Sequence, residues 1–242
     1  MNRQALVCRN ILEKPDITQR EMAKNMDISL GTVNGLVKGY IAEEENGKEK
    51  HLILLEKGKE LLKPYKVDGA LIIAAGFGSR FVPLTFETPK GLLEVFGERM
   101  IERQIKQLHE VGIHDITIAV GYLKEKFEYL IDKYDVKLLY NPEYSCKNTL
   151  ATVYRARKFL KGRNVYILSS DNWMRENMYH SYECGAWYSA AHEEGETKEW
   201  CLTFNKKGRI SDVNVGGKDA WFMYGPVYLS REFSAKFLPV LE

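Results

Sequence analysis

The chain has 242 residues and a formal net charge of +2, with 45% hydrophobic and 28% charged residues. This is the composition of an ordinary globular protein, long enough for one large domain or for a medium domain and a small one. The charge is too small to predict nucleic-acid binding by itself, and no apolar run approaches a membrane span or a signal-peptide core. We therefore expect a cytoplasmic protein with no membrane partner.

The cysteines and histidines predict neither a zinc site nor a redox motif. Cys8, Cys146, Cys184 and Cys201 do not pair at the spacing of metal ligands or of redox-active cysteines. The five histidines are also scattered. We expect reduced cysteines without a special role.

The first 66 residues predict a small helical module. Residues 3–13 predict a helix that stops near Pro15, and Thr18 with Glu21 fits a capping box that begins a second helix. Ser29 is the expected N-cap of a third helix, whose apolar residues recur at helical spacing.

A strand over residues 50–55, returning from a hairpin, and a closing helix over residues 56–63 complete this module. The order of elements resembles the winged helix-turn-helix of bacterial transcription regulators. In that family the third helix enters the major groove of DNA. The exposed positions of that helix here would be Ser29, Leu30, Thr32, Asn34 and Lys38.

The charge of the module gives only weak support for DNA as a partner. Residues 1–66 contain 12 Lys and Arg against 10 Asp and Glu, whereas phosphate neutralisation usually dominates DNA affinity. Two hypotheses therefore stay open, DNA binding and a role in homodimer formation or in docking on a partner. A linker follows, so we expect a winged helix-turn-helix domain over residues 1–66 and a second domain over residues 67–242.

Strand and helix patterns alternate through most of the second domain. The strands are expected over residues 70–75, 113–120, 136–140 and 164–169. The helices are expected around residues 100–108, 123–131 and 148–160. This alternation predicts an α/β fold, a mainly parallel, Rossmann-like sheet with helices on both faces.

Beyond Asp171 the pattern changes to consecutive strands. These are expected over residues 187–192, 200–205, 209–215 and 220–229, before a last helix over residues 231–241. We expect a mixed extension of the sheet that forms one wall of a ligand pocket.

The first buried strand ends in a glycine-containing loop, Gly76-Phe77-Gly78, followed by Ser79 and Arg80. Such a loop can direct backbone N–H groups at phosphate oxygens, and an arginine adds a planar charged donor. A Gly-x-Gly pair alone is more often a plain turn. The loop also lacks the third glycine of the dinucleotide fingerprint and the Gly-Lys-Ser/Thr of the P-loop.

Ligands of parallel α/β sheets lie beyond the carboxyl ends of the strands. That geometry brings residues 76–80, Gly121-Tyr122 and Asp171 to one edge of the predicted sheet. Lys90 adds a second positive charge, ten residues after Arg80.

The stretch 69–105 resembles the nucleoside-triphosphate transferase family. The match consists of Ala-Ala-Gly-x-Gly-x-Arg, Pro-Leu-Thr, Pro-Lys and Gly-x-x-x-Ile-Glu-Arg. The Ser79-Arg80-Phe81 variant and the Ile101-Glu102-Arg103 ending look most like CTP:phosphocholine cytidylyltransferases. The resemblance extends from about Asp68 to the end of the chain.

The resemblance implies that a phosphomonoester oxygen attacks the α-phosphorus of a nucleoside triphosphate and expels pyrophosphate. This nucleophile is already anionic at neutral pH, so positioning and charge neutralisation suffice. Arg80 would hold the outer phosphates, Lys90 would lie between the two substrates, and Asp171 would bind Mg²⁺. Each also has a structural alternative: a surface ion pair for Arg80, a solvated side chain for Lys90 and a turn cap for Asp171.

The resemblance also implies binding residues. The nucleotide-binding candidates are Ala74, Ala75, Gly76, Phe77, Gly78, Ser79, Gly121, Tyr122 and Asn148. Aromatic faces attract a quaternary ammonium such as choline. Trp200 is the leading candidate to bind it, because Glu199-Trp200 matches the phosphocholine enzymes. The other candidates are Tyr188, Trp221 and Tyr224, and the alternative is that these rings are core or cross-strand residues.

One departure concerns the second metal carboxylate of the family, which would follow residue 242. Asp212 and Asp219 are nearby carboxylates that fit this role poorly. We therefore expect the second domain to be incomplete at its C-terminus.

The leading interpretation is an Mg²⁺-dependent cytidylyltransferase that uses CTP and phosphocholine and has an attached winged helix. The alternatives are a sugar-1-phosphate nucleotidyltransferase and a metabolite-sensing transcription regulator with a weakened catalytic domain.

Overall fold

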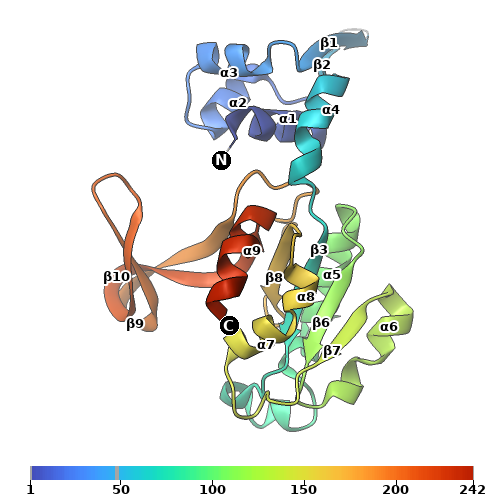
Figure 1. Ribbon diagram of the computed structural model, residues 1–242, viewed down its shortest axis with the longest axis vertical. Coiled ribbons are helices and arrows are strands. Elements are labelled where there is room, and N and C mark those ends of the chain that lie inside the picture. The colour runs from blue at the N-terminus through green and yellow to red at the C-terminus, as the bar shows by residue number, and fades with distance from the viewer. Residues whose placement is uncertain (1, 47–48, 242) are drawn as a thin grey trace. The chain divides into compact units, whose positions relative to one another are not determined.

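A computed structural model describes residues 2–46 and 49–241 of the chain (Figure 1). The described chain folds as two compact units. The first consists of Met1–Val67 together with His180–Gly185, and the second of Asp68–Tyr179 together with Ala186–Glu242.

The first unit is built from short helices and one hairpin (Figure 1). Its elements are α1 (Arg3–Glu13), α2 (Gln19–Asn25), α3 (Leu30–Val37), β1 (Ile41–Asn46), β2 (Glu49–Leu54) and α4 (Glu56–Leu62). Strands β1 and β2 pair antiparallel, and the two residues that join them lie outside the described residues. The apolar faces of the helices meet in a core that includes Val7, Ile11, Met22, Val33 and Leu52.

Local hydrogen bonds start the helices of the first unit where the sequence predicts. The Thr18 side chain accepts from the Glu21 N–H while the Glu21 carboxylate accepts from the Thr18 N–H, which confirms the capping box of α2. The Ser29 side chain accepts from the Thr32 N–H, which confirms the N-cap of α3.

Residues 180–185 pack with the first unit, although they follow most of the second unit in the sequence. Arg9 donates to the carboxylate of Glu183 at 2.9 Å, and both side chains are largely buried. The Glu183 N–H donates to the carbonyl of Tyr65, and Cys184 is buried in the same apolar cluster as Leu62. This segment falls within the second domain predicted from the sequence, over residues 67–242, because such long-range contacts leave no local pattern.

All four cysteines are free thiols. Burial raises the pKa of Cys8 and of Cys184 to about 11, so these thiols stay protonated at neutral pH. Within the described residues, no helix is long and apolar enough to cross a membrane.

The second unit is organised around a six-stranded sheet in the order β7-β6-β3-β8-β10-β9. Its strands are β3 (Gly69–Ala74), β6 (Ile116–Val120), β7 (Lys137–Tyr140), β8 (Val165–Ser169), β9 (Trp187–Phe204) and β10 (Ile210–Leu229). Strands β7, β6, β3 and β8 are parallel, whereas β10 runs antiparallel to both β8 and β9. This arrangement confirms the mainly parallel α/β sheet with a mixed extension.

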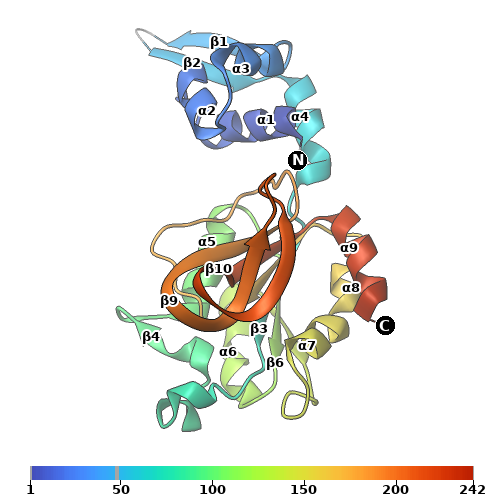
Figure 2. The same cartoon turned by 90° about the vertical axis from the view of Figure 1, so that its left-hand side faces the viewer.

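Helices cover both faces of this sheet, as Figures 1 and 2 show. One face carries α7 (Thr149–Arg155), α8 (Arg157–Leu160) and α9 (Arg231–Phe237). The other carries α5 (Met100–Glu110) and α6 (Tyr129–Tyr134). Leu71, Val153, Leu160 and Val165 belong to the buried core under the first face.

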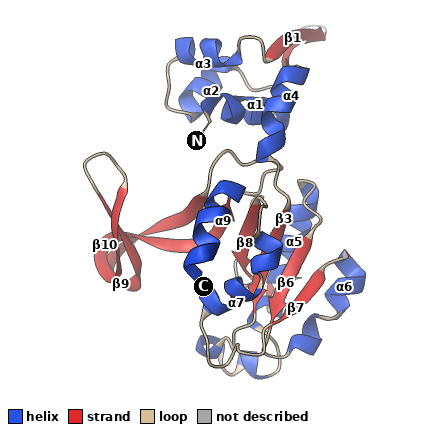
Figure 3. Ribbon diagram, in the orientation of Figure 1, coloured by secondary structure: helices blue, strands red, loops and turns tan. Residues whose placement is uncertain are grey.

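Three details differ from the predicted elements. A small hairpin, β4 (Glu94–Val95) with β5 (Glu98–Arg99), precedes α5. The single helix predicted over residues 148–160 is divided at Ala156, whose ψ of 4° turns the chain between α7 and α8. The four strands predicted after Asp171 are two long, bent strands, β9 and β10 (Figure 3). Glycines with positive φ, such as Gly216 at 82°, allow these strands to bend without ending.

The buried Arg9–Glu183 pair predicts that Glu183→Gln destabilises the first unit. Arg9 would keep its charge in a largely buried position with only the more distant Glu13 carboxylate, 3.9 Å from its Nε, as an anionic partner, at a cost of about 1–3 kcal/mol. The loss is measured as the change in unfolding free energy of the first unit, with chemical denaturant and with the hydrogen-exchange rates of the α1 amides as the signal.

The matched control is Glu56→Gln, because Glu56 pairs with Lys59 on the surface and both side chains are exposed. The four tryptophans lie in the second unit, so their fluorescence reports whether that unit is also affected. Equal stability of the two variants would contradict a structural role of the Arg9–Glu183 pair.

Candidate active site

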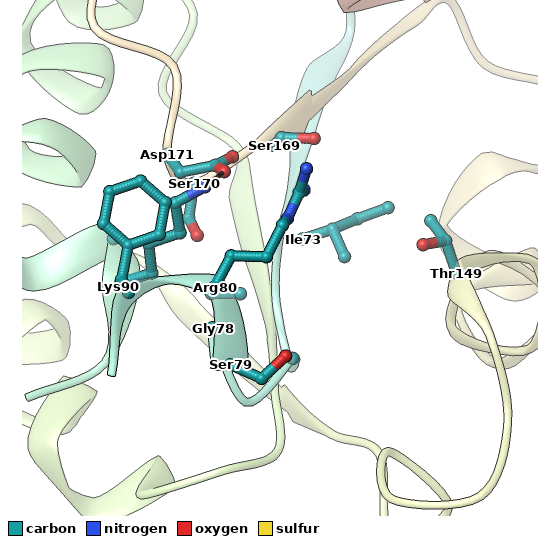
Figure 4. A pocket seen from close by; sticks show the side chains of 13 residues that line it. Ile73, Gly78, Ser79, Arg80, Lys90, Thr149, Ser169, Ser170 and Asp171 are labelled. Atoms are coloured by element: carbon teal, nitrogen blue, oxygen red, sulfur yellow. Dashed lines mark hydrogen bonds and ion pairs between the residues drawn. The ribbon is translucent and has the colours of Figure 1, made fainter. Parts of the chain in front are cut away.

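A pocket of about 310 Å³ opens where β3 and β8 end (Figure 4). Its lining residues come from these two strands, the segments after them and the start of α7: Ile73, Ala74, Gly76, Gly78, Ser79, Arg80, Phe81, Lys90, Gly91, Thr149, Ser169, Ser170 and Asp171. Arg80, Lys90 and Asp171, the three predicted catalytic residues, therefore line one pocket. In Figure 4, Thr149 lies on the side of the pocket away from Lys90 and Asp171.

The glycine loop after β3 is held in one conformation by its neighbours. Gly78 has a φ of 65°, in the left-handed region that favours glycine, and a 3₁₀ turn over Ser79–Phe81 follows it. The Thr85 hydroxyl donates to the carbonyl of Gly78 at 2.9 Å. A Cβ atom on Gly78 would lie only 3.0 Å from the Thr85 side chain and 3.2 Å from Cβ of Lys90. The loop therefore packs tightly against the segment that carries Lys90.

Lys90 and Asp171 form an ion pair at one side of the pocket (Figure 4). Their side chains are 21% and 29% exposed, so a ligand can reach both of them. The Lys90 ammonium also lies 4.2 Å from the ring centroid of Phe81. The pair places one positive charge and one carboxylate where two strands of the sheet end.

Close backbone packing brings these two charges together. The Ser170 N–H donates to the carbonyl of Ile73 at 3.0 Å, which holds the segment after β8 against β3. Gly91, directly after Lys90, lies so near this segment that an added Cβ atom would be 2.6 Å from Cβ of Ser170. Gly91 and Ser170 were not among the predicted site residues, although a glycine directly after the Pro-Lys motif was a usable signal.

The residues predicted from the neighbouring strand β6 support the loop from the side. The Tyr122 N–H donates to the carbonyl of Ala75 at 3.1 Å, and its hydroxyl donates to the carbonyl of Phe86 at 2.9 Å. The Phe77 ring packs on the rings of Tyr122 and Tyr144, each at a centroid distance of 5.2 Å. Phe77, Ala75 and Tyr122 thus lie beside the pocket rather than among its lining residues.

Gly121 has a packing role at the same place. A Cβ atom there would lie 2.6 Å from Cβ of Tyr144 and 2.7 Å from the carbonyl oxygen of Ala75. Asn148, the other predicted nucleotide ligand, caps α7, because its side-chain oxygen accepts from the Leu150 N–H at 3.1 Å. The next residue, Thr149, lines the pocket instead.

A second, apolar cavity of about 620 Å³ adjoins the first pocket, and the two share Ile73, Thr149 and Ser169. Strands β8, β9 and β10 and helices α7 and α9 contribute its other residues: Leu150, Val153, Ile167, Leu168, Ala186, Trp187, Tyr188, Ile210, Met223, Gly225, Val227, Tyr228, Leu229, Phe233 and Phe237. None of these lining residues carries a charge. The cavity can therefore accept an apolar group whose polar end remains in the first pocket.

The four predicted aromatic ligands are placed differently from one another. Tyr188 lines the apolar cavity, and its burial raises the pKa of its hydroxyl. Trp200 is 56% exposed on β9 and does not line either of these two cavities. Trp221 packs edge-on against His192, and Tyr224 packs edge-on against Phe222.

Asp171 is the single carboxylate among the residues that line the first pocket. Asp212 accepts from the Asn214 side chain, and Asp219 accepts from the Gly195 N–H; neither lines this pocket. Within the described residues, no group of three or more His, Cys, Asp or Glu side chains could hold a metal ion. Asp171 fits a hard divalent cation that takes most of its oxygen ligands from a bound phosphate chain and water.

Glu102, in the Ile-Glu-Arg motif, has a structural role on α5. Its buried carboxylate accepts from Tyr129, Lys133 and Tyr134 at 2.7 Å each and so joins α5 to α6. Burial alone would raise the pKa of Glu102, but the three hydrogen bonds and the Lys133 charge outweigh it and lower the pKa to about 2.

The fold and the site together define an α/β protein whose pocket combines a glycine loop, two cationic side chains and a carboxylate, a set suited to phosphate groups. Residues 69–193 match the family model described as nucleotidyl transferase. The chain belongs to this family of transferases.

Individual relatives extend the likeness. The choline-phosphate cytidylyltransferase of Streptococcus pneumoniae is 35% identical over 173 residues, covering 72% of this chain and 75% of that protein. The 2-aminoethylphosphonate cytidylyltransferase of Lancefieldella rimae is 36% identical over 163 residues, covering 66% of each chain, just under two thirds of that relative's length. The solved structure of CTP:phosphocholine cytidylyltransferase from Streptococcus pneumoniae has a TM-score of 0.67 and 35% identity, covering 73% of this chain and 76% of that one.

The low pKa of Glu102 predicts an acid-dependent loss of stability. Because the pKa in the folded chain lies below the ordinary value of 4.5, the stabilisation is complete above that pH and is lost as the pH falls toward 2. With allowance for the partly exposed Lys133, the loss is on the order of 2 kcal/mol. We expect Glu102→Gln to unfold with a weaker pH dependence over this range, in urea denaturation at successive pH values. If the unfolding free energies of Glu102→Gln and of the unchanged chain fall equally as the pH is lowered, this assignment is contradicted.

Proposed function

We propose that this chain transfers a cytidylyl group from CTP to phosphocholine and releases CDP-choline and pyrophosphate. The observation that carries the proposal is the Lys90–Asp171 pair, which lies in one pocket with the glycine loop and Arg80. The two cytidylyltransferase relatives support cytosine as the base, and each has an acceptor with a cationic nitrogen and a phosphorus group.

The residues of the pocket suit a reaction that needs no general base. An oxygen of the phosphocholine phosphate attacks the α-phosphorus of CTP in line, and the bond from this phosphorus to the pyrophosphate oxygen breaks. The phosphate is anionic at neutral pH, so no proton has to be removed before attack. No histidine or cysteine is among the residues lining the pocket, in agreement with catalysis by positioning and charge.

Each charged side chain has a distinct role in this proposal. The backbone of residues 76–79 binds the triphosphate, and Arg80 neutralises its outer phosphates. Lys90 lies between the two substrates and reduces the repulsion between their phosphates. Asp171 would hold Mg²⁺, which supplies further neutralisation of the triphosphate when it is bound.

The Lys90–Asp171 pair also suggests how the site changes on binding. Without substrate, each side chain neutralises the other. A phosphate near Lys90 and a cation near Asp171 would replace this pair with two new pairs of opposite charge. The charges required by the reaction are therefore already together before the substrates bind.

The apolar cavity supports phosphocholine rather than a sugar phosphate as the acceptor. A sugar would need hydroxyl-binding carboxylate and amide side chains, whereas the residues lining the cavity are mainly aliphatic and aromatic and include no Asp, Glu, Asn or Gln. Aromatic faces such as that of Tyr188 attract a quaternary ammonium. We place the trimethylammonium group in this cavity, with the phosphate directed toward Lys90.

We expect pyrophosphate release from CTP and phosphocholine in the presence of Mg²⁺, and little from UTP or dTTP with sugar 1-phosphates. Lys90→Ala and Asp171→Ala should each lower kcat by about a hundredfold to a thousandfold, because each removes charge stabilisation at the reacting phosphates. A coupled pyrophosphate assay measures both effects.

Lys137→Ala and Asp212→Asn are matched controls, because both side chains carry the same charges outside the pocket. Near-normal turnover by the Lys90 or Asp171 variant would refute the role of that residue. If the chain turns over a sugar 1-phosphate and not phosphocholine, the acceptor in the proposal is wrong and the sugar 1-phosphate takes its place.

We further propose that residues 1–66 form a winged helix-turn-helix that binds DNA. The order of three helices, a hairpin and a closing helix supports this assignment, with α3 as the recognition helix. Leu30, Thr32, Asn34 and Lys38 are exposed on or next to α3 and so are available to contact bases or phosphates.

DNA binding predicts a salt-dependent increase in fluorescence anisotropy of a mixed-sequence duplex. Lys38→Ala should weaken binding to this duplex and reduce the salt slope by about one, while Asn34→Ala should leave the salt slope unchanged. Thr18→Ser keeps the cap of α2 and serves as the control. No binding at low salt would eliminate DNA and leave dimer formation or a protein partner.

A further inference from the structure

The segment that carries Asp171 has a second anchor, the side chain of Gln104. This glutamine lies in the middle of α5 and is fully buried. Its side-chain N–H₂ group donates to the carbonyl of Ser169 at 3.0 Å and to the carbonyl of Asn172 at 2.9 Å. The two N–H donors of the Gln104 amide therefore bind one carbonyl before Asp171 in the chain and one after it.

These two bonds act on the short turn that follows β8. The Asn172 N–H donates to the carbonyl of Ser169 at 3.3 Å, a weak turn bond. The Ser170 N–H also donates to the carbonyl of Ile73. Backbone hydrogen bonds thus involve three residues around the carboxylate, Ser169, Ser170 and Asn172. Gln104 ties the first and the last of them to a rigid helix, so the direction of the Asp171 side chain depends on it.

The neighbours of Gln104 on α5 hold the chain further along. Arg103 donates to the carbonyls of Met174 and Arg175, and its guanidinium lies 4.6 Å from the ring centroid of Trp173. Gln107 donates to the carbonyl of Met174 at 3.1 Å. Two buried glutamines one helical turn apart thus donate hydrogen bonds to the same segment, but only Gln104 bonds to carbonyls on both sides of Asp171.

We infer that Gln104 is a positioning residue that sets the place of the Asp171 carboxylate relative to Lys90 and a bound divalent cation. This inference rests on the proposed role of Asp171. Gln104 does not touch a substrate; it acts through the backbone carbonyls of Ser169 and Asn172. If its two bonds are lost, the turn can rotate and the carboxylate moves relative to the triphosphate site. Displacements of about 1 Å are enough to cost about a hundredfold in rate.

The test compares Gln104→Met with Gln107→Met in the full chain. Both changes remove a buried amide from the same helix and conserve volume, but only the first frees the turn around Asp171. We expect Gln104→Met to speed hydrogen exchange of residues 169–173 by about tenfold. It should also weaken Mn²⁺ binding in the presence of CTP by about tenfold to a hundredfold. The kcat should fall by a similar factor with little change in KM for CTP.

Gln107→Met should change each of these quantities by less than about threefold, because it loses one bond three residues beyond Asp171. Equal effects of the two variants on exchange and on Mn²⁺ binding would overturn the inference, since they would show only a general loosening of α5. Thermal unfolding of both variants checks that they fold.

The hydrogen exchange measurement separates this inference from the proposed function, because it needs neither metal nor substrate. If Asp171→Ala binds Mn²⁺ and CTP as well as the unchanged chain does, the proposed role of Asp171 fails, and the positioning inference fails with it. If Asp171→Ala loses Mn²⁺ and Gln104→Met behaves like Gln107→Met, only the positioning inference fails.

Discussion

The second unit depends on the close approach of two chain segments at the carboxyl edge of its sheet. Gly91 and Ser170 pack so closely that no side chain fits between them, and this contact places Lys90 beside Asp171. Opposite charges then meet in a pocket that solvent can still reach. A nucleotidyl transferase site needs such an arrangement, since its chemistry consists mainly of gathering and neutralising phosphates.

The elements around this contact have complementary roles. Strand β3 provides the glycine loop, and β6 supports that loop through Tyr122 and Gly121. Helix α5 holds the other side, with Glu102 fixing the helix to α6 and Gln104 fixing the turn at Asp171. The Ile-Glu-Arg motif thus contains a residue, Glu102, whose hydrogen bonds join two helices and which does not line the pocket.

The chain that continues from Asp171 also contributes to the first unit. It follows α5 through its contacts with Arg103 and Gln107 and then, over residues 180–185, packs against α1 of the first unit. The buried Arg9–Glu183 pair and the thiol of Cys184 make this segment part of that core. The first unit is therefore completed by residues that the sequence places after most of the transferase fold.

The sequence by itself determined the features that depend on near neighbours along the chain. The capping box at Thr18, the alternation of strands and helices and the glycine loop at the end of β3 follow from local hydrogen bonding, periodicity and backbone freedom. Strand-end geometry also predicted that Arg80 and Asp171 would lie at one edge of the sheet, and the family resemblance added Lys90; all three line one pocket. Only the tertiary structure decided the contact of Gly91 with Ser170, the bracket formed by Gln104, the continuity of β9 and β10 and the packing of residues 180–185. Three of these features join residues far apart in the chain, so the sequence does not show which residues meet, even where a glycine such as Gly91 marks one side of the contact. Strands β9 and β10 continue instead because glycines with positive φ let them bend without ending.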